Sequence, residues 1–164
     1  MNHLQHLENK IIEPSGLDAL LSEWKKQQYR VVFTNGCFDL LHRGHIDYLS
    51  RAASLGDKLF IGVNTDASVS ALKGPGRPIQ DERSRLMILA ALSFTGAVML
   101  FGKPTPYELI RKVQPDVLVK GSDYRPEDIV GYDIVTARGG QVLTIDYLPG
   151  FSTSAIEARI RNGK

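Results

Sequence analysis

The hydrophobic positions of this chain fall into short continuous runs, separated by longer stretches with helical spacing. Five runs are predicted as strands because they are continuous rather than alternating, as in strands that helices cover on both faces. They lie at residues 31–33, 59–63, 97–101, 117–119 and 142–145. The stretches between and after them predict helices over residues 46–54, 83–92, 107–113, 127–137 and 156–160. Strands that alternate with helices predict a doubly wound α/β fold around a five-stranded parallel sheet, Rossmann-like in the broad sense.

The first 28 residues differ from the rest because they are polar and carry no strand pattern. Leu17, Leu20, Leu21 and Trp24 recur at helical spacing after a turn signal at residues 14–16. We therefore expect an N-terminal helical segment at residues 1–28, followed by one α/β domain at residues 29–164.

Composition narrows the class of protein. Of the 164 residues, 43% are hydrophobic and 23% are charged, which is typical of a globular domain and excludes a disordered chain. The formal net charge of +2 is too small to indicate nucleic acid or an anionic membrane as a partner. Cys37 is the only cysteine, no secretory signal is visible, and no apolar run is long enough to cross a bilayer. These features predict a cytoplasmic protein without a membrane or nucleic-acid partner.

The segment after the first strand, residues 34–45, carries the most distinctive chemistry. Ligands of doubly wound sheets bind at the carboxyl ends of the strands, and Gly36 lets the backbone approach a ligand there. If a helix begins at this point, His42 and His45 share one face of its N-terminus. Free N–H groups and two imidazoles at that position suit a phosphate group.

The spacing of the two histidines alone also fits a surface pair or a metal site. Zinc is disfavoured because the other histidines, His3 and His6, lie in what we expect to be a mobile tail, and Cys37 is the only thiol. From the spacing alone, phosphate binding and these alternatives remain open.

Residues 36–45, Gly-Cys-Phe-Asp-Leu-Leu-His-Arg-Gly-His, resemble the G-x-F-D-x-x-H-x-G-H signature of the nucleotidyltransferase superfamily. Members of that superfamily transfer a nucleoside monophosphate from a triphosphate to a phosphorylated acceptor and release pyrophosphate. Residues 118–124, Leu-Val-Lys-Gly-Ser-Asp-Tyr, resemble the corresponding block of the adenylyltransferases that make ADP-heptose, with Ser122 in place of a glycine. Further similar blocks are Asn64-Thr65-Asp66, Leu72-Lys73-Gly74 with Arg77-Pro78, Arg85, and Ser152-Thr153-Ser154, where Ser154 replaces a threonine.

The resemblance implies a nucleotidyltransferase fold and a specific reaction. ATP and D-glycero-β-D-manno-heptose 1-phosphate would give ADP-heptose and pyrophosphate, by in-line attack at the α-phosphorus, in the synthesis of lipopolysaccharide core precursors. Mg²⁺ would arrive with ATP, and we assign it no protein ligand. Family members also occur fused behind a sugar kinase; since this sequence shows no kinase half, it resembles the free-standing form.

The resemblance also implies roles for individual residues. His42 and His45 would contact the ATP phosphates, while Lys73 and Arg85 would hold the acceptor phosphate or the departing pyrophosphate. Several of these residues also have a purely structural interpretation: Lys73 as a solvated charge, Arg85 as an ion-paired residue, Asp39 as a residue that orders its loop, Asp123 as a cap, and residues 152–154 as an ordinary helix N-cap. The nucleotide would be bound by Thr34, Asn35, Gly36, Cys37, Phe38, Asp39, Gly44, Lys120, Gly121, Asp123, Ser152, Thr153 and Ser154.

Two other functions compete with this hypothesis. Cytidylyltransferases that act on glycerol 3-phosphate or a choline-like phosphate share the histidine motif, but they carry an Arg-Thr-x-Gly-Ile-Ser block before the last helix. Residues 148–152 here are Leu-Pro-Gly-Phe-Ser, without an arginine, which favours ATP over CTP. The second alternative is a non-catalytic nucleotide-binding module. A homodimer is possible, because symmetric dimers are the commonest assemblies.

Overall fold

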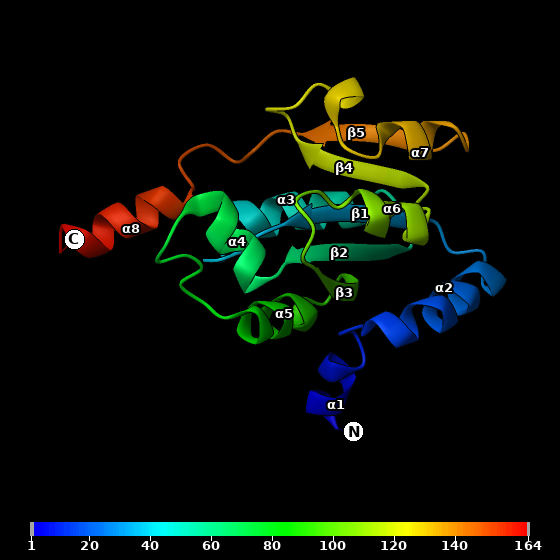
Figure 1. The fold of residues 1–164 in the computed structure, drawn as a ribbon, viewed down its shortest axis with the longest axis horizontal. Coiled ribbons are helices and arrows are strands. Elements are labelled where there is room, and N and C mark those ends of the chain that lie inside the picture. The colour runs from blue at the N-terminus through cyan, green and yellow to red at the C-terminus, as the bar shows by residue number, and fades with distance from the viewer. Residues whose placement is uncertain (1, 164) are drawn as a thin grey trace.

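The computed structural model describes residues 2–163 and contains a five-stranded parallel sheet in the order β3-β2-β1-β4-β5 (Figure 1). The predicted doubly wound α/β architecture is therefore confirmed. The strands are β1 (Val31–Gly36), β2 (Lys58–Asn64), β3 (Thr95–Phe101), β4 (Val117–Gly121) and β5 (Gln141–Ile145).

Helices cover both faces of the sheet. One face packs against α3 (Arg43–Ala53) and α5 (Glu82–Ala91), and the other against α2 (Leu17–Lys26), α6 (Tyr107–Val113) and α7 (Tyr132–Thr136). Figure 1 shows α4 (Asp66–Lys73) and α8 (Thr153–Arg161) beyond the carboxyl ends of the strands, with α8 projecting away from the sheet. The remaining elements are α1 (His3–Glu8) and the 3₁₀ turns η1 (Pro14–Gly16) and η2 (Pro126–Asp128).

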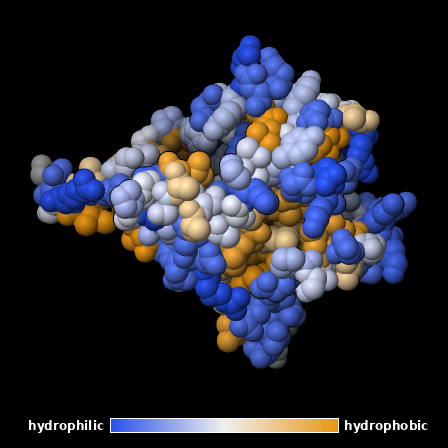
Figure 2. All heavy atoms as spheres, in the orientation of Figure 1, coloured by the Kyte–Doolittle hydropathy of each residue, from blue (hydrophilic) through white to orange (hydrophobic). Residues whose placement is uncertain are grey.

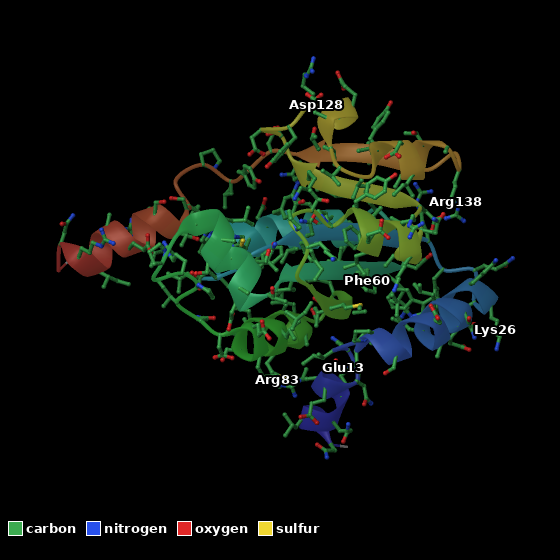
Figure 3. All side chains as sticks on the ribbon, in the orientation of Figure 1. Glu13, Lys26, Phe60, Arg83, Asp128 and Arg138 are labelled. Atoms are coloured by element: carbon green, nitrogen blue, oxygen red, sulfur yellow. The ribbon has the colours of Figure 1, made fainter. Side chains whose placement is uncertain are left out.

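Two hydrophobic clusters, one on each face of the sheet, form the core. On the α6 face, Phe33 and Phe60 are fully buried and stack at 5.8 Å between ring centroids. Phe60 is labelled in Figure 3, and the edge of Trp24 from α2 packs against it at 6.3 Å. The N-terminal segment thus contributes to the main core.

The N-terminal segment is more ordered than its sequence suggested. His3 and His6 lie in α1, which is capped by the Asn2 side chain, so placing them in a mobile tail was wrong. Ile11 then forms a parallel bridge with Val98 at the edge strand β3. We propose that residues 1–28 are a helical extension packed on the domain formed by residues 29–164.

The other differences from the predicted elements concern short helices. The helix predicted over residues 127–137 is wrong: the chain forms η2, a turn and then α7, because Gly131 adopts a φ of 93° and lies against Ile110. Helix α4 was not predicted, since only Ser68 and Val69 of its eight residues are buried and the hydrophobic periodicity is weak. No helix within residues 2–163 is long and apolar enough to span a membrane.

The sheet changes its winding direction between β1 and β4. The connection from β1 to β2 runs through α3 on one face, and the connection from β4 to β5 runs through α7 on the other. Strands β1 and β4 pair at only two positions, Val32 with Val117 and Phe33 with Leu118. A crevice therefore opens beyond these pairs at the carboxyl ends, where such sheets bind ligands.

Candidate active site

Two stacked histidines mark the start of α3. His42 is the N-cap residue of this helix and His45 lies in its first turn, so the predicted helix N-terminus is confirmed. Their ring centroids are 3.9 Å apart with an interplanar angle of 28°, and the edge of Phe38 packs on His45 at 5.6 Å. Both Nδ1 atoms are buried without a hydrogen-bond partner. Neither Nε2 atom bonds to another described residue, so it is the nitrogen left for a ligand.

Burial keeps both imidazoles uncharged. It lowers the pKa of His42, and it lowers the pKa of His45 to about 4, with further contributions from the charges of His42 and Lys73. Both rings are therefore neutral at pH 7 and each carries one proton. Since no acceptor faces Nδ1, we assign that proton to Nε2, which makes each ring a neutral hydrogen-bond donor.

Gly44, between the two histidines, is required by close packing. A Cβ atom there would lie 3.0 Å from the His42 ring and 3.1 Å from the Cβ atom of Phe151. Phe151 precedes α8, and its ring lies 5.4 Å from the guanidinium of Arg43. The absence of a side chain at residue 44 thus lets the start of α8 approach the start of α3.

Asp39 holds a neighbouring loop in place. Its buried carboxylate accepts hydrogen bonds from the backbone N–H groups of Ile79 (2.8 Å) and Gln80 (2.9 Å) and from Arg77 Nη1 (2.7 Å). Burial alone would raise the pKa of Asp39, but these hydrogen bonds, first that of Gln80, hold it below its usual value. Asp39 therefore orders the loop, as one of its two sequence interpretations held, and is poorly suited to accept a proton.

Arg77 connects this loop to the C-terminal helix. Its guanidinium pairs with Asp39 through Nη1 and with Glu157 of α8 through Nη2. No residue of α8 is fully buried, and this ion pair attaches the helix to the loop that Asp39 holds. Arg77 thereby joins the β1–α3 segment, the α4–α5 loop and α8.

Arg85 is enclosed by protein rather than open to a ligand. Its side chain is fully buried and donates to the carbonyl oxygens of Cys37 (2.7 Å) and Gln80 (3.1 Å) and to Asp66 Oδ1 (2.8 Å). The predicted contact with a substrate phosphate is therefore not supported, whereas the ion-paired interpretation is. We propose that Arg85 is a positioning residue that fixes the Cys37 backbone.

Lys73 and the start of α8 are exposed, as their predicted contacts with a ligand require. Lys73 is the exposed last residue of α4, and its charge reaches His45. Ser152 Oγ accepts the Ala155 N–H at 3.1 Å, which makes it the N-cap of α8. Ser154 is exposed and Thr153 half-buried, so their hydroxyls remain available beside a helix N-terminus.

A cavity of about 310 Å³ lies at the carboxyl end of β1. It is lined by residues 35–37, 104–106 and 128–130 and by Asn64, Leu72, Phe101, Lys120 and Tyr124. Figure 2 shows hydrophobic residues gathered in the middle of the face that it draws, to the right of and below α4. Neither His42 nor His45 lines the cavity. The histidine pair therefore lies outside the lining of this cavity, which does include residues 35–37 at the end of β1.

Lys120 reaches across the crevice from β4 to β1. Its Nζ donates to the backbone carbonyl and to Oδ1 of Asn35, both at 3.2 Å. The pKa of Lys120 is lowered chiefly by burial, against the raising effect of the Asp123 charge. This ammonium lies among neutral oxygen atoms.

The other predicted nucleotide-binding residues divide into internal and accessible groups. Thr34 is fully buried and its hydroxyl bonds to Tyr48 Oη at 2.8 Å, so only its backbone is available. A Cβ atom at Gly121 would overlap the Tyr147 hydroxyl at 2.0 Å, which explains the glycine. Asp123 is exposed, and its charge contributes after burial to raising the pKa of Tyr147 to about 12.

Sequence reasoning did not assign four residues of this region. Asn64 and Arg77 belong to blocks that carried the family resemblance, so a signal for them existed. Tyr147 and Glu157 act through contacts with Gly121 and Arg77, which are remote in sequence, and no pattern in the chain indicates them. Within residues 2–163, no three histidine, cysteine, aspartate or glutamate side chains are grouped as metal ligands.

Comparison with known proteins gives a consistent family. The profile of the family described as Cytidylyltransferase-like matches residues 33–159. The chain is 51% identical over 157 residues to "Bifunctional protein HldE" of Rhodopseudomonas palustris strain BisB5, and 50% identical over 156 residues to the protein of that name from Bradyrhizobium diazoefficiens. These matches cover 95% of this chain but 32% of each relative, so the chain spans about a third of their length.

Solved structures support the same fold. The lipopolysaccharide core biosynthesis protein from Thermoplasma volcanium superposes with a TM-score of 0.60 at 27% identity, covering 73% of this chain and 98% of that one. Pantoate-beta-alanine ligase from Francisella tularensis gives a TM-score of 0.57 at 14% identity, covering 92% of this chain and 76% of that one, which shows similarity of fold alone. The predicted nucleotidyltransferase-like fold is confirmed.

Proposed function

The chain belongs to the cytidylyltransferase-like family, and from this premise we propose that it is an adenylyltransferase that joins the AMP part of ATP to a sugar 1-phosphate and releases pyrophosphate. The observation that carries the proposal is the pair of stacked, uncharged histidines at the N-terminus of α3. Two neutral donors beside free helix N–H groups match a triphosphate whose α-phosphorus gains negative charge during transfer.

The reaction requires no proton transfer from the protein. An oxygen of the sugar phosphate forms a bond to the α-phosphorus of ATP, and the bond from that phosphorus to the bridging oxygen of pyrophosphate breaks. The acceptor is already an anion, so it needs no general base. His42 and His45 donate through Nε2 to phosphate oxygens, and the protein acts by positioning and by stabilising charge.

The segments around the histidines supply the remaining contacts. Lys73 would contact the phosphates next to His45, and the hydroxyls of Thr153 and Ser154 would contact the nucleotide at the start of α8. The backbone of residues 36–38 would lie along the nucleotide, held by Arg85 through the Cys37 carbonyl oxygen.

The preference for ATP and for a heptose rests on two features. Residues 148–152 lack the arginine of the cytidylyltransferases, and residues 118–124 resemble the ADP-heptose enzymes. The solved structure of a lipopolysaccharide core biosynthesis protein fits the same pathway. We therefore propose D-glycero-β-D-manno-heptose 1-phosphate as the acceptor, in the cytoplasm, where lipopolysaccharide core precursors are made.

A divalent metal such as Mg²⁺ would enter with the triphosphate. The described residues offer no cluster of three ligating side chains, whereas Mg²⁺ commonly binds substrate phosphates and keeps several waters. Phosphate oxygens rather than a protein cage would thus hold it, and bound there it would neutralise charge on the triphosphate. Every other contact described above comes from the chain itself.

Pyrophosphate release tests the proposal. The purified chain is mixed with Mg²⁺, heptose 1-phosphate and either ATP or CTP, and glucose 1-phosphate serves as the control acceptor. We expect pyrophosphate and ADP-heptose with ATP and heptose 1-phosphate. Turnover with CTP alone would instead support the cytidylyltransferase, and binding of ATP without turnover of any acceptor would support a nucleotide-binding module.

A further inference from the structure

We propose that the cavity between the ends of β1 and β4 binds the acceptor, and that the Lys120 ammonium holds the acceptor's phosphate group. This inference rests on the proposed adenylyltransferase function. It changes the role that the sequence gave Lys120, from a residue of the nucleotide site to one of the acceptor site.

The first argument is the electrostatic surroundings of Lys120. Its hydrogen-bond partners are the two oxygens of Asn35, and no carboxylate among residues 2–163 lies within ion-pair distance. The charge of Asp123 acts on Lys120 from beyond that distance and raises its pKa, but burial lowers that pKa more. A half-buried cation without an ion-pair partner is costly, and a bound anion would offset that cost. A phosphate monoester is the anion that the proposed reaction supplies.

The second argument is the place of Lys120 in the sheet. Pairing of β1 with β4 stops at Phe33 and Leu118, so the crevice opens two residues before Lys120. Lys120 and Tyr124 line the cavity in this opening, and Lys120 Nζ lies 5.7 Å from the centre of the Tyr124 ring. The ammonium is thus held at the edge of a cavity by direct contacts with uncharged groups, the oxygens of Asn35 and the ring of Tyr124.

The third argument is the geometry of the reaction. In an in-line displacement the attacking and leaving oxygens lie on opposite sides of the phosphorus. Residues 35–37 at the end of β1 line the cavity, whereas His42 and His45 at the start of α3 do not. A triphosphate held at the histidine pair would therefore leave the cavity free for the acceptor.

The cavity walls suit the rest of a sugar phosphate. Asn64 and Thr105 offer polar groups, while Leu72, Phe101 and Ile129 offer apolar surface. The Asn64 amide is fixed by its hydrogen bond to Ser68 Oγ at 2.9 Å. Mixed polar and apolar walls match a ring that carries hydroxyl groups on a carbon skeleton.

The test compares Lys120→Met and Lys120→Arg with the control Lys112→Met, an exposed lysine of α6. Loss of a charged hydrogen-bond donor to a phosphate should raise the KM for heptose 1-phosphate about 10–100-fold in Lys120→Met, with partial recovery in Lys120→Arg. The KM for ATP should change less than about threefold, as in the control. Calorimetric titration with heptose 1-phosphate should show the same loss of affinity.

Other results would overturn the inference. A rise in the KM for ATP would return Lys120 to the nucleotide site, and a lowered melting temperature with unchanged KM values would make it only a link between β1 and β4. If Lys120→Met does not fold, acetylation of the wild-type chain with acetic anhydride, read by peptide mass spectrometry, decides: heptose 1-phosphate should protect Lys120 and ATP alone should not. Equal labelling in all samples contradicts the inference. Failure of the wild-type chain to use any sugar 1-phosphate would instead reject the proposed function.

Discussion

At the scale of single residues, the site depends on uncharged donors rather than on cations. His42 and His45 are kept neutral by burial and are stacked on each other, and the exposed Lys73 is a cation whose charge acts on His45. Neutral donors stabilise the growing charge of a transition state without binding every phosphate group in the cell tightly. The histidines should therefore matter more for turnover than for binding.

His42→Ala tests this expectation. Loss of one donor aimed at the α-phosphate should lower kcat about 10²–10³-fold, while the KM for ATP changes little. Steady-state pyrophosphate release measures both constants, and circular dichroism checks that the fold is intact. Unchanged turnover would remove His42 from the proposed mechanism.

The burial of His45 also predicts how stability depends on pH. The pKa of His45 is about 4 in the folded chain, below the value of 6.5 for an unfolded histidine. Between these two values the unfolded state binds more protons, so stability should fall as the pH drops from 6.5 to 4 and should not depend on His45 above 6.5. The loss is on the order of 2–3 kcal/mol.

Urea unfolding of the wild-type chain and of His45→Gln between pH 4 and 7.5 measures this effect. Carboxylates titrate in both proteins, so the difference between the two curves isolates His45. We expect the stability of the wild-type chain relative to the variant to decrease below pH 6.5. A constant difference across the range would show that His45 is not held neutral by the fold.

At the scale of elements, the site is assembled from segments that follow strands β1, β2 and β5. Asp39, Arg77 and Glu157 join these segments through one guanidinium. Helix α8 has no fully buried residue, and this link ties it to the loop after α4. The loop after α4 and the start of α8 should therefore move together.

Arg77→Ala should free α8 and raise the KM for ATP about 5–10-fold, with a smaller effect on kcat, because it removes a hydrogen-bonded ion pair that is partly buried. Glu157→Gln should have part of this effect, and the double variant should be no worse than Arg77→Ala alone. Arg77→Lys should recover part of the affinity. Additive effects in the double variant would contradict a shared link, and the exposed pair of Arg111 with Glu108 provides a matched control.

The sequence predicts the elements well where burial sets a strong pattern, and less well where it does not. Strands β1 to β4 are mostly buried runs, so their hydrophobicity locates them, and in β5 the half-buried run that ends at the buried Ile145 suffices. Helix α4 has only two buried residues, so its hydrophobic pattern is too weak to locate it. The break at Gly131 depends on a contact with Ile110, twenty-one residues away in sequence, which a local pattern does not reveal.

The same distinction applies to the site. The histidine pair and Gly44 follow from the contiguous motif at residues 36–45, and Lys73 follows from a separate block that resembles the same family. The burial of Arg85 and the bridging role of Arg77 arise from tertiary contacts with Cys37, Asp66 and Glu157. Charge and spacing are visible in a sequence, but whether a guanidinium faces solvent or protein is decided by packing.

At the scale of the whole molecule, helix α2 and the candidate site lie at opposite ends of the sheet. Helix α2 packs at the amino-terminal ends of the strands in Figure 1, and α4 and α8 lie beyond the carboxyl ends. Trp24 of α2 contacts Phe60 in the core between them. The segment should therefore support stability without taking part in the chemistry.

Trp24→Ala separates these roles. Removing this buried ring should lower the free energy of unfolding by about 3–5 kcal/mol, because it leaves a cavity against Phe60. The KM values for both substrates should remain within about twofold of the wild-type values at a temperature where the variant is folded. Urea unfolding and pyrophosphate release measure the two quantities, and a large change in KM without a loss of stability would contradict this division.

The unpartnered Nδ1 atoms of the two stacked rings restrict the chemistry that this protein can perform. A hydrolase that deprotonates an alcohol relies on a carboxylate behind its histidine to stabilise the imidazolium that forms, and these rings have none. A sugar with a neutral hydroxyl would therefore find no base at the histidine pair to accept its proton. The absence of a carboxylate behind the rings thus favours an acceptor that is already an anion, whatever contacts the sugar itself makes.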